Sequence, residues 1–295
     1  MKFVTLKKCP LCGSSEIIDF KHGTINVKKI DSDNFKITDS SYGSLWDFSR
    51  CKKCSFVFSN PKLDKESLIE FYSALEDTEY SEEKDGRAKN FKTVLNRIKK
   101  LQPADNSLLD IGSASGIFVK LAKEKGYNAD GIEPSGFLVK EAKEKFGIDL
   151  FRGTVEEFKN KHRYSVITLL DIIEHVHSPE NFISQVSELL NDKGLLVIVT
   201  PDIDSFTSKI TGSRWWHYRI AHINFFNKKS LEYLLKKNGL EIVEVKRYAW
   251  NFSLFYLLSR LFPMLKKKKS LQNVLKRINL KVQLFDSLEI YARKI

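Results

Sequence analysis

The feature that most constrains the fold of this chain is a short apolar strand followed by an acid and a turn of small residues, residues 107–116 with the sequence SLLDIGSASG. Gly, Ala and Ser put almost no side chain in the way of a ligand, so the backbone of such a turn can approach a bound molecule closely. Residues 117–124 then have the apolar spacing of a helix. The pattern therefore predicts a cofactor-binding turn at the point where a strand is followed by a helix.

The length and composition fit one large α/β domain with a smaller appendage, because the chain has 295 residues, of which 42% are hydrophobic and 29% charged. The segment before Cys9 has no apolar core, so we expect neither a secretory signal nor a membrane anchor and predict a cytoplasmic protein. The formal charge of +12 is uneven. Residues 246–295 contain twelve Lys or Arg and two acidic residues, which accounts for +10 of the total.

All four cysteines fall into two pairs with the spacing of metal ligands, and these residues are Cys9, Cys12, Cys51 and Cys54. Four thiolates form a closed tetrahedral zinc site of the structural kind, so we predict a zinc-ribbon domain over residues 1–60, with strands at 16–20 and 45–48. Such a metal stabilises a domain whose core is too small to fold alone. Direct contact between this domain and the substrate, and a redox role of the cysteine pairs, are the alternatives.

Residues 61–101 have the spacing of helices with charged faces, and we predict that this segment covers the cofactor site. From residue 102 the chain alternates strand and helix, which is typical of a parallel sheet with helices on both faces, and we assign residues 102–295 to this α/β domain. The predicted strands are 108–111, 129–133, 149–151, 165–170 and 195–200, and the predicted helices between them are 117–125, 135–146, 154–159 and 179–190. A sheet of this kind binds ligands at the carboxyl ends of its strands, beside the point where the strand order reverses.

A second acid, Glu133, ends the next predicted strand, 23 residues after Asp110. A carboxylate at this place can accept hydrogen bonds from both hydroxyls of a ribose, as nucleotide-type cofactors require. A surface acid is the alternative, but the order of acid, turn, helix, strand and terminal acid favours a nucleotide-type cofactor. Position 117 is Ile where a dinucleotide fingerprint has its third glycine, which argues against a dehydrogenase.

These motifs resemble those of the class I S-adenosylmethionine-dependent methyltransferases, whose first motif is an acid followed by alternate glycines, as in residues 110–116. Residues 153–157 resemble the family segment that lines the adenine. Residues 171–176, DIIEHV, resemble the motif after the fourth strand in the ubiquinone-type and sugar-modifying branches. The resemblance implies a Rossmann-like, seven-stranded, mostly parallel sheet and S-adenosylmethionine as the cofactor.

The cofactor-binding residues that the resemblance implies are Asp110, Gly112, Ser113, Ala114, Gly116, Glu133, Pro134, Thr154, Val155 and Asp171. Two of them depart from the family pattern. Ala114 replaces the middle glycine, a small change that should still admit the cofactor, and Thr154 replaces an Asp that faces the adenine in many members. The cysteine pairs further resemble those of zinc-bearing methyltransferases of bacterial sugar and surface-glycan pathways, which implies a small-molecule, sugar, glycolipid or quinone-like acceptor.

Methyl transfer to a hydroxyl or an acidic carbon needs a general base, and histidine has a suitable pKa. The first candidate is His175, which follows the fourth strand, where the family's acceptor lies near the methyl group. The alternative is that Glu174 and His175 open a helix and cap or brace it. The second candidate is His222, in an insertion after the fifth strand. The aromatic and basic segment 215–219 of this insertion could form a lid over the acceptor or pack between helices.

Two final strands, at 241–249 and 283–294, form an antiparallel hairpin in the resembled fold, and an insertion at 251–282 interrupts it. The apolar stretches of the insertion are too short to span a bilayer, but they lead into the four lysines 266–269. We therefore expect either peripheral contact of residues 252–269 with the inner face of an anionic membrane or a helix packed on the sheet. An RNA methyltransferase that grips RNA through the ribbon and the basic segment, and a non-catalytic cofactor-binding adaptor at a membrane, are the alternative functions. Nucleic acid is less favoured because the charge is confined to one segment.

Overall fold

A computed structural model describes residues 1–25, 30–36, 44–77, 84–159, 162–261 and 269–295. Its strands are β1 (Phe3–Val4), β2 (Ile17–Lys21), β3 (Phe48–Cys51), β4 (Val57–Ser59), β5 (Lys62–Leu63), β6 (Ser107–Ile111), β7 (Asn128–Glu133), β8 (Phe151–Arg152), β9 (Tyr164–Leu170), β10 (Leu190–Pro201), β11 (Asn224–Phe225), β12 (Leu240–Arg247), β13 (Trp250–Ser253), β14 (Asn279–Val282) and β15 (Ser287–Lys294). Its α-helices are α1 (Lys65–Ser73), α2 (Lys84–Lys100), α3 (Ile117–Glu124), α4 (Gly136–Phe146), α5 (Pro179–Leu189), α6 (Phe206–Thr211), α7 (Lys228–Lys237), α8 (Leu254–Leu261) and α9 (Lys269–Leu275).

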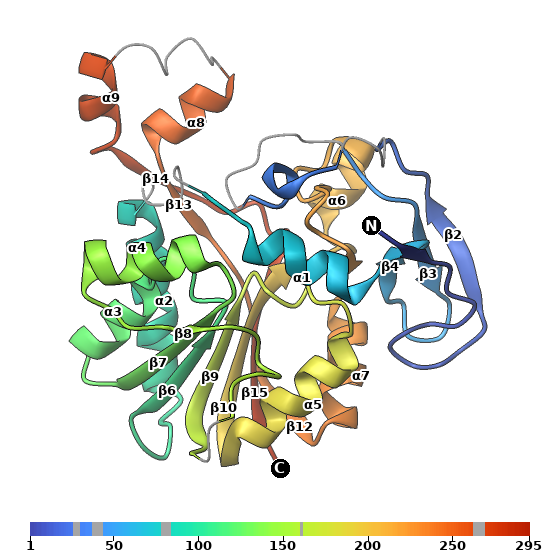
Figure 1. Cartoon of the computed structure of the whole chain (residues 1–295), viewed down its shortest axis with the longest axis horizontal. Helices are drawn as coiled ribbons and strands as arrows, with labels where there is room; N and C mark the ends of the chain where they lie inside the picture. Colours follow the sequence, from blue (N-terminus) through green and yellow to red (C-terminus); the bar gives the residue numbers. More distant parts are fainter. Residues whose placement is uncertain (26–29, 37–43, 78–83, 160–161, 262–268) are drawn as a thin grey trace.

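The main sheet has seven strands in the order β12-β15-β10-β9-β6-β7-β8 (Figure 1). β6 pairs in parallel with both β7 and β9, and β9 pairs in parallel with β10. β15 runs antiparallel between β10 and β12. The predicted seven-stranded, mostly parallel Rossmann-like sheet is therefore confirmed. Because the chain builds from β6 toward β7 and β8 and then crosses to β9, the strand order reverses beside β6.

Alternate residues of the central strands point to opposite faces of the sheet and build two hydrophobic cores. In β10, Leu195 and Val197 belong to the core that includes buried residues of α2, α3 and α4. Leu196 and Ile198, on the other face, belong to the core that includes buried residues of α5 and α7. Both faces of the sheet are covered in this way, so the strand ends are the place where a ligand can reach the sheet.

The segment predicted as a zinc ribbon, residues 1–60, shares a four-stranded sheet with a distant part of the chain. This four-stranded sheet has the order β11-β4-β3-β2, and β11 comes from a segment more than 160 residues beyond its partner β4. The amide of Ser59 donates to the carbonyl of Ile223 at 2.8 Å. The indole of Trp46 donates to the carbonyl of Ile220 at 2.7 Å. The ribbon is thus held against the segment that precedes β11.

Three predicted elements are displaced: the strand expected at 45–48 lies at 48–51, the strand expected at 149–151 lies at 151–152, and the helix expected at 154–159 is a turn. Leu45 accepts hydrogen bonds from the amides of Thr24 and Ile25, so its backbone pairs outside the ribbon sheet. At the predicted helix, the amide and the hydroxyl of Thr154 both donate to Glu157 Oε2, at 2.8 and 3.0 Å. This local bonding replaces the hydrogen bonds of a helix.

The two final strands, β12 and β15, form the expected antiparallel pair. The insertion between them begins and ends with the strands of the β13–β14 hairpin and carries α8 and α9, which project from the domain (Figure 1). Lysines 266–268 of the basic cluster lie outside the described residues. Among the helices that the structure describes, none combines the length and the hydropathy needed to cross a bilayer.

Candidate functional site

The carboxyl ends of β6 and β9 meet where the strand order reverses, and from there the chain continues to β7 on one side and to β10 on the other. Asp110 in β6 is paired with Thr168 in β9, whose hydroxyl donates to Asp110 Oδ1 at 2.6 Å. Asp110 is 3% exposed, and burial raises its pKa to about 7. The first of the three predicted cofactor acids thus lies near the carboxyl end of β6.

The turn after β6 requires small residues at defined positions. Gly112 and Gly116 have φ values of +77° and +74°, and Ala114 has a φ of +47°. A Cβ on Gly112 would lie 2.0 Å from Cδ1 of Ile172. Ser115 Oγ is buried and has no hydrogen-bond partner among the described residues. The backbone of this turn leaves no room for side chains, and the hydroxyl of Ser115 is buried without a partner among the described residues. Both features are typical of a turn that binds a ligand.

Glu133, at the end of β7, faces the same turn. Its Oε2 accepts from the amide of Ala114 at 2.8 Å, and its Oε1 accepts from the amide of Ser135 at 2.9 Å. Burial raises the pKa of Glu133 to about 7, and the two hydrogen bonds from backbone amides oppose this rise. Each carboxylate oxygen has a second lone pair, so Glu133 can hold the turn and still accept from a ligand hydroxyl.

The other predicted cofactor residues near the turn have different surroundings. Ser113 Oγ donates to the backbone carbonyl of Asp110 at 2.8 Å and so braces the turn. Pro134 directly follows Glu133, and Val155 is 8% exposed. The hydroxyl proton of Thr154 is used in the bond to Glu157 Oε2. Of this group, Ser113 therefore contacts Asp110, and Pro134 directly follows Glu133.

Asp171, which follows β9, has a φ of +58° that turns the chain sharply at the crevice. Burial raises its pKa to about 7, while the positive charges of Arg87 and Arg219 oppose the rise. These arginines were not among the predicted site residues. Arg87 comes from the amphipathic helix α2 and gives no sequence signal, whereas Arg219 belongs to the basic and aromatic segment 215–219, for which a lid over the acceptor was one of the two predicted roles.

His175 lies in the turn after β9, and its hydrogen bonds define its tautomer. Nδ1 is 2.9 Å from the carbonyl oxygen of Ala221, and because a carbonyl can only accept, Nδ1 carries the proton. The hydroxyl of Tyr72, a residue of α1, lies 2.8 Å from the same Nδ1 and 3.3 Å from the same carbonyl. Burial lowers the pKa of His175 to about 4, so the ring is neutral at pH 7. Since α5 begins only at Pro179, His175 does not open or cap that helix.

The structure brings His222 next to His175, with ring centroids 4.7 Å apart. Burial lowers the pKa of His222 well below its usual value. Burial also raises the pKa of Glu174 well above its usual value. Glu174 Oε2 accepts a hydrogen bond from the hydroxyl of Thr200 at 2.9 Å. In the described part of the chain, Glu174 Oε1 and His222 Nδ1 have no hydrogen-bond partner. Ligand atoms of Glu174, His175 and His222 lie within 4.8 Å of one another, a spacing that would allow these three residues to bind a metal ion.

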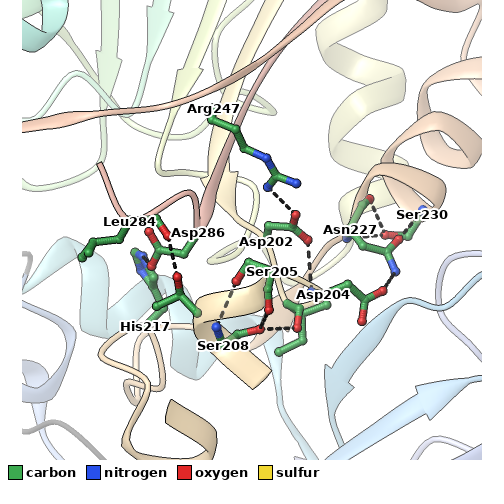
Figure 2. Close-up of polar contacts among 12 residues, drawn as sticks. Asp202, Asp204, Ser205, Ser208, His217, Asn227, Ser230, Arg247, Leu284 and Asp286 are labelled. Atoms are coloured by element: carbon green, nitrogen blue, oxygen red, sulfur yellow. Dashed lines mark hydrogen bonds and ion pairs between the residues drawn. The ribbon is translucent and has the colours of Figure 1, made fainter. Parts of the chain in front are cut away.

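The aromatic segment after β10 packs into the core. Trp215 is fully buried, its ring centroid is 5.6 Å from that of Phe225, and its indole donates to Asp286 Oδ2 at 3.1 Å. His217 Nε2 lies 3.2 Å from the same carboxylate oxygen (Figure 2). Tyr218 is 3% exposed. Trp215 and Tyr218 therefore pack in the core and do not form a lid.

A polar network joins the end of β10 to three neighbouring elements. Asp202 pairs with Arg247 of β12, and Asp204 accepts from the side-chain amide of Asn227, the N-cap residue of α7 (Figure 2). Asp204 also pairs with Arg50 of β3 in the ribbon, at 2.8 Å. An ion pair thus supplements β11 in holding the ribbon against the strand ends.

The four cysteines form one cluster whose sulfur atoms lie within 4.8 Å of one another. The distance between the sulfurs is 3.6 Å for Cys9 and Cys54 and 3.5 Å for Cys12 and Cys51. Four sulfurs at about 2.3 Å from a zinc ion lie about 3.8 Å apart in a tetrahedron, whereas a disulfide needs about 2.05 Å. The hydrogen bond with Cys54 lowers the pKa of Cys9, so one thiolate is already favoured. The cluster fits a tetrahedral zinc ion.

Comparison with known proteins relates this chain to methyltransferases. The model of a family described as "Methyltransferase domain" matches residues 83–245, more than half of the chain. The ubiquinone biosynthesis O-methyltransferase of Rhodopseudomonas palustris (strain BisB5) is 27% identical over 156 residues, which cover 49% of this chain and 62% of that relative. The protein of the same name from Saccharophagus degradans is 30% identical over 167 residues, which cover 52% of this chain and 71% of that relative. The match thus spans less than two thirds of the R. palustris protein.

The fold also has a counterpart among solved structures. Magnesium protoporphyrin IX methyltransferase from Synechocystis PCC 6803, solved with bound SAM, superposes with a TM-score of 0.51 and 12% sequence identity. The superposition covers 80% of this chain and 100% of that one. At this identity the likeness concerns the fold, and it agrees with the seven-stranded sheet described above.

Proposed function

This chain belongs to the class I S-adenosylmethionine-dependent methyltransferases, and we propose that it methylates a small-molecule acceptor, namely a sugar, a glycolipid or a quinone-like compound, in cell-surface glycan or lipid biosynthesis. The observation that carries this proposal is the pair of neutral imidazoles, the half-buried His175 and the buried His222, next to the proposed cofactor site of Asp110 and Glu133. Ile172 connects the cofactor turn with the two histidines, because it lies against Gly112 of the turn and precedes His175 by three residues.

The crevice has the features needed to hold S-adenosylmethionine, which supplies a methyl group on a sulfonium. Glu133 would accept hydrogen bonds from the ribose hydroxyls, and the backbone of residues 112–116 would lie along the cofactor. Asp110, buried below the turn, fixes the end of β6 through its bond to Thr168. These residues bind and orient the donor, and in-line methyl transfer depends mainly on such alignment.

His175 is the residue that we propose as the general base, with His222 as the second proton acceptor. With Nδ1 bonded to Ala221, the lone pair of His175 is on Nε2. A pKa near 4 makes His175 neutral but weakly basic, so it suits an acceptor proton that becomes acidic as the methyl group is transferred. A hydroxyl or an activated carbon meets this condition.

The four cysteines would hold a zinc ion in a closed, structural site, as their spacing supports. Residues 252–269 would provide peripheral contact with a membrane that carries the acceptor, because their apolar stretch leads into a run of lysines. Both features are consistent with an acceptor that is partly lipid or surface glycan.

Calorimetry with S-adenosylhomocysteine tests the donor side. We expect binding by the native chain and a loss of affinity of about tenfold or more in Glu133→Gln, because the ribose loses a charged acceptor. The control is Glu141→Gln, which changes another buried glutamate, in α4. Absence of heat with the native chain would contradict the proposed donor.

Labelled methyl transfer into a cell lysate, fractionated into lipid, glycan and RNA, tests the acceptor side. We expect label in the lipid or glycan fraction, and its loss in His175→Gln but not in His177→Gln, a half-buried histidine of the same loop. Label confined to RNA would replace the proposed acceptor class. Label in no fraction, together with normal binding of S-adenosylhomocysteine, would favour a non-catalytic adaptor.

A further inference from the structure

Helix α6 and the turn before β15 expose a group of large apolar side chains. Phe206 and Ile210 of α6 are 76% and 67% exposed, and Leu284 and Phe285 of the turn are 42% and 57% exposed. Phe206 and Ile210 are four residues apart in a helix, so their side chains share one face. Apolar residues that are exposed together, rather than singly, mark an interaction surface. We call these four residues the apolar patch.

Hydrogen bonds hold the two segments of the apolar patch side by side. The amide of Asp202 donates to the carbonyl of Asp286 at 2.8 Å, and further along the hydroxyl of Thr207 donates to the carbonyl of Leu284. Figure 2 shows the side chain of Leu284 pointing away from the polar network around Asp202. Since Thr207 directly follows Phe206 in the chain, Phe206 and Leu284 belong to the same part of the surface.

The backbone at Phe285 has a conformation that bulky residues rarely adopt, with a φ of +56°. The next residue, Asp286, is 2% exposed; its Oδ2 accepts from the indole of Trp215 at 3.1 Å and lies 3.2 Å from His217 Nε2. These contacts fix Asp286 in the interior while Phe285 stays exposed. Such strained positions are typical of segments that take part in binding.

The charged residues next to the apolar patch are basic. Lys209 lies between the two apolar residues of α6, and Arg214 follows this helix; both are exposed. Lys281, which is also exposed, comes shortly before the turn. The two segments that contain the patch, residues 205–219 and 277–285, together have five Lys or Arg and no Asp or Glu.

The acids closest to the apolar patch in the chain do not offset this charge at the surface. Asp202 is 4% exposed and pairs with Arg247, and Asp204 pairs with Arg50 at 2.8 Å (Figure 2). Asp286 is buried, as described above. The apolar patch is therefore surrounded by positive charge.

We propose that the apolar patch and the basic residues around it dock on an anionic bilayer, with Phe206 and Phe285 inserted among the headgroups. Apolar side chains with Lys and Arg around them match a surface that is apolar inside and anionic outside. A second copy of this chain would instead bring two basic surfaces together. The docking surface extends the membrane contact proposed for residues 252–269 to the body of the domain. Figure 1 shows α6 and the helices α8 and α9 beyond the same edge of the main sheet.

The apolar patch also lies close to the proposed acceptor side. Asp286 connects the turn with His217, whose ring stacks on that of His222 with the centroids 6.0 Å apart. A bilayer docked on the patch brings a lipid-linked acceptor close to His222. This role rests on the proposed function, whereas the docking itself does not depend on it.

Sedimentation with vesicles of phosphatidylcholine, with or without phosphatidylglycerol, tests the docking of the full chain. We expect the native chain to bind only the vesicles with phosphatidylglycerol and to dissociate as the salt concentration rises. Phe206→Asp combined with Phe285→Asp should lower the partition coefficient by about tenfold or more, and Lys209→Gln should lower it by about fivefold. Asp adopts the left-handed conformation more readily than Phe, so Phe285→Asp should fold.

The matched control is Val243→Asp, because Val243 is 46% exposed at the bulge of β12 and lies outside the apolar patch. This variant should bind the vesicles like the native chain. Equal binding by the double variant and by Val243→Asp would overturn the proposal.

Quenching by brominated lipid separates the apolar patch from residues 252–269. Phe206→Trp places a fluorophore in the patch, and vesicles with brominated acyl chains should quench its added emission but not that of Val243→Trp. Ultracentrifugation without vesicles tests the other occupant: self-association of the native chain that the double variant abolishes would make a second copy the partner and overturn the proposal. The double variant should still bind S-adenosylhomocysteine, and absence of this binding in the native chain would contradict the proposed function instead.

Discussion

The substitution Gly112→Ala tests whether the cofactor turn and the loop of His175 pack against each other as the structure indicates. The added Cβ would lie 2.0 Å from Cδ1 and 2.8 Å from Cγ1 of Ile172, at a φ of +77°. A left-handed backbone costs an L residue about 1–2 kcal/mol, and displacing a packed side chain costs about 1–3 kcal/mol. We therefore expect the free energy of unfolding to fall by about 2–5 kcal/mol, the sum of these two terms. Affinity for S-adenosylhomocysteine should fall as well, because the turn shifts.

Gly126→Ala is the matched control, since Gly126 has a φ of +88°, but a Cβ added there would have no atom of the described residues within 4 Å. It should lose only the backbone term, about 1–2 kcal/mol, and keep its cofactor affinity. Ile172→Val removes the nearest atom, so Gly112→Ala should cost about 1 kcal/mol less in that background. Urea unfolding followed by tryptophan fluorescence gives the free energies. Equal losses for Gly112→Ala and Gly126→Ala would refute the packing of the turn on Ile172.

Three further predictions concern charge and metal. The pKa of His175 is about 4 in the folded chain against about 6.5 in the unfolded chain, so the folded chain binds fewer protons between these values. Lowering the pH from 7.5 to 4.5 should therefore destabilise the native chain by about 2–3 kcal/mol more than His175→Gln, as urea unfolding would measure. Arg97→Met leaves the fully buried Glu289 without its ion pair, so we expect the free energy of unfolding to fall by about 2 kcal/mol. Adding Glu289→Gln to the same chain should partly restore it. An unchanged melting temperature of Arg97→Met would contradict this prediction. Chelation of the metal, or Cys51→Ser, should lower the melting temperature by about 10 °C or more, whereas Lys53→Ser, an exposed change between the two cysteines, should not.

The proximity of Asp110, the turn at 112–116 and Glu133 could be predicted from the sequence, because these parts of the proposed cofactor side are close together in the chain. The turn at 112–116 follows β6 directly, and Glu133 ends β7, the next strand in both sequence and sheet. Parallel pairing of consecutive strands puts their carboxyl ends at one edge, so the order of residues alone places Asp110 and Glu133 together. The alternation of strand and helix likewise predicted the main sheet.

The acceptor side could be predicted only in part, because its residues meet through tertiary structure. His175 and His222 were identified from their positions after the fourth and fifth strands, but nothing in the sequence indicated that their rings lie 4.7 Å apart. Tyr72 is a single polar residue on an amphipathic helix, and such a position carries no periodic signal. β11 has two residues, too few for a pattern of alternation, so its pairing with the ribbon could not be expected.

This division of the site limits what the relatives of this chain reveal about its acceptor. The region shared with the family, residues 83–245, contains the proposed cofactor-binding residues and both histidines. Tyr72 and Trp46 lie outside that region, yet they donate hydrogen bonds to the carbonyls of Ala221 and Ile220, the two residues before His222. Lys62, also outside that region, donates to the side chain of Asn224. The wall of the proposed acceptor side is therefore built jointly by the shared domain and by the N-terminal segment with its following helix. A binding site selects its ligand by the shape and polarity of its whole wall. The acceptor of a relative that lacks this N-terminal segment therefore does not identify the acceptor of this chain, even where the cofactor-binding residues are the same.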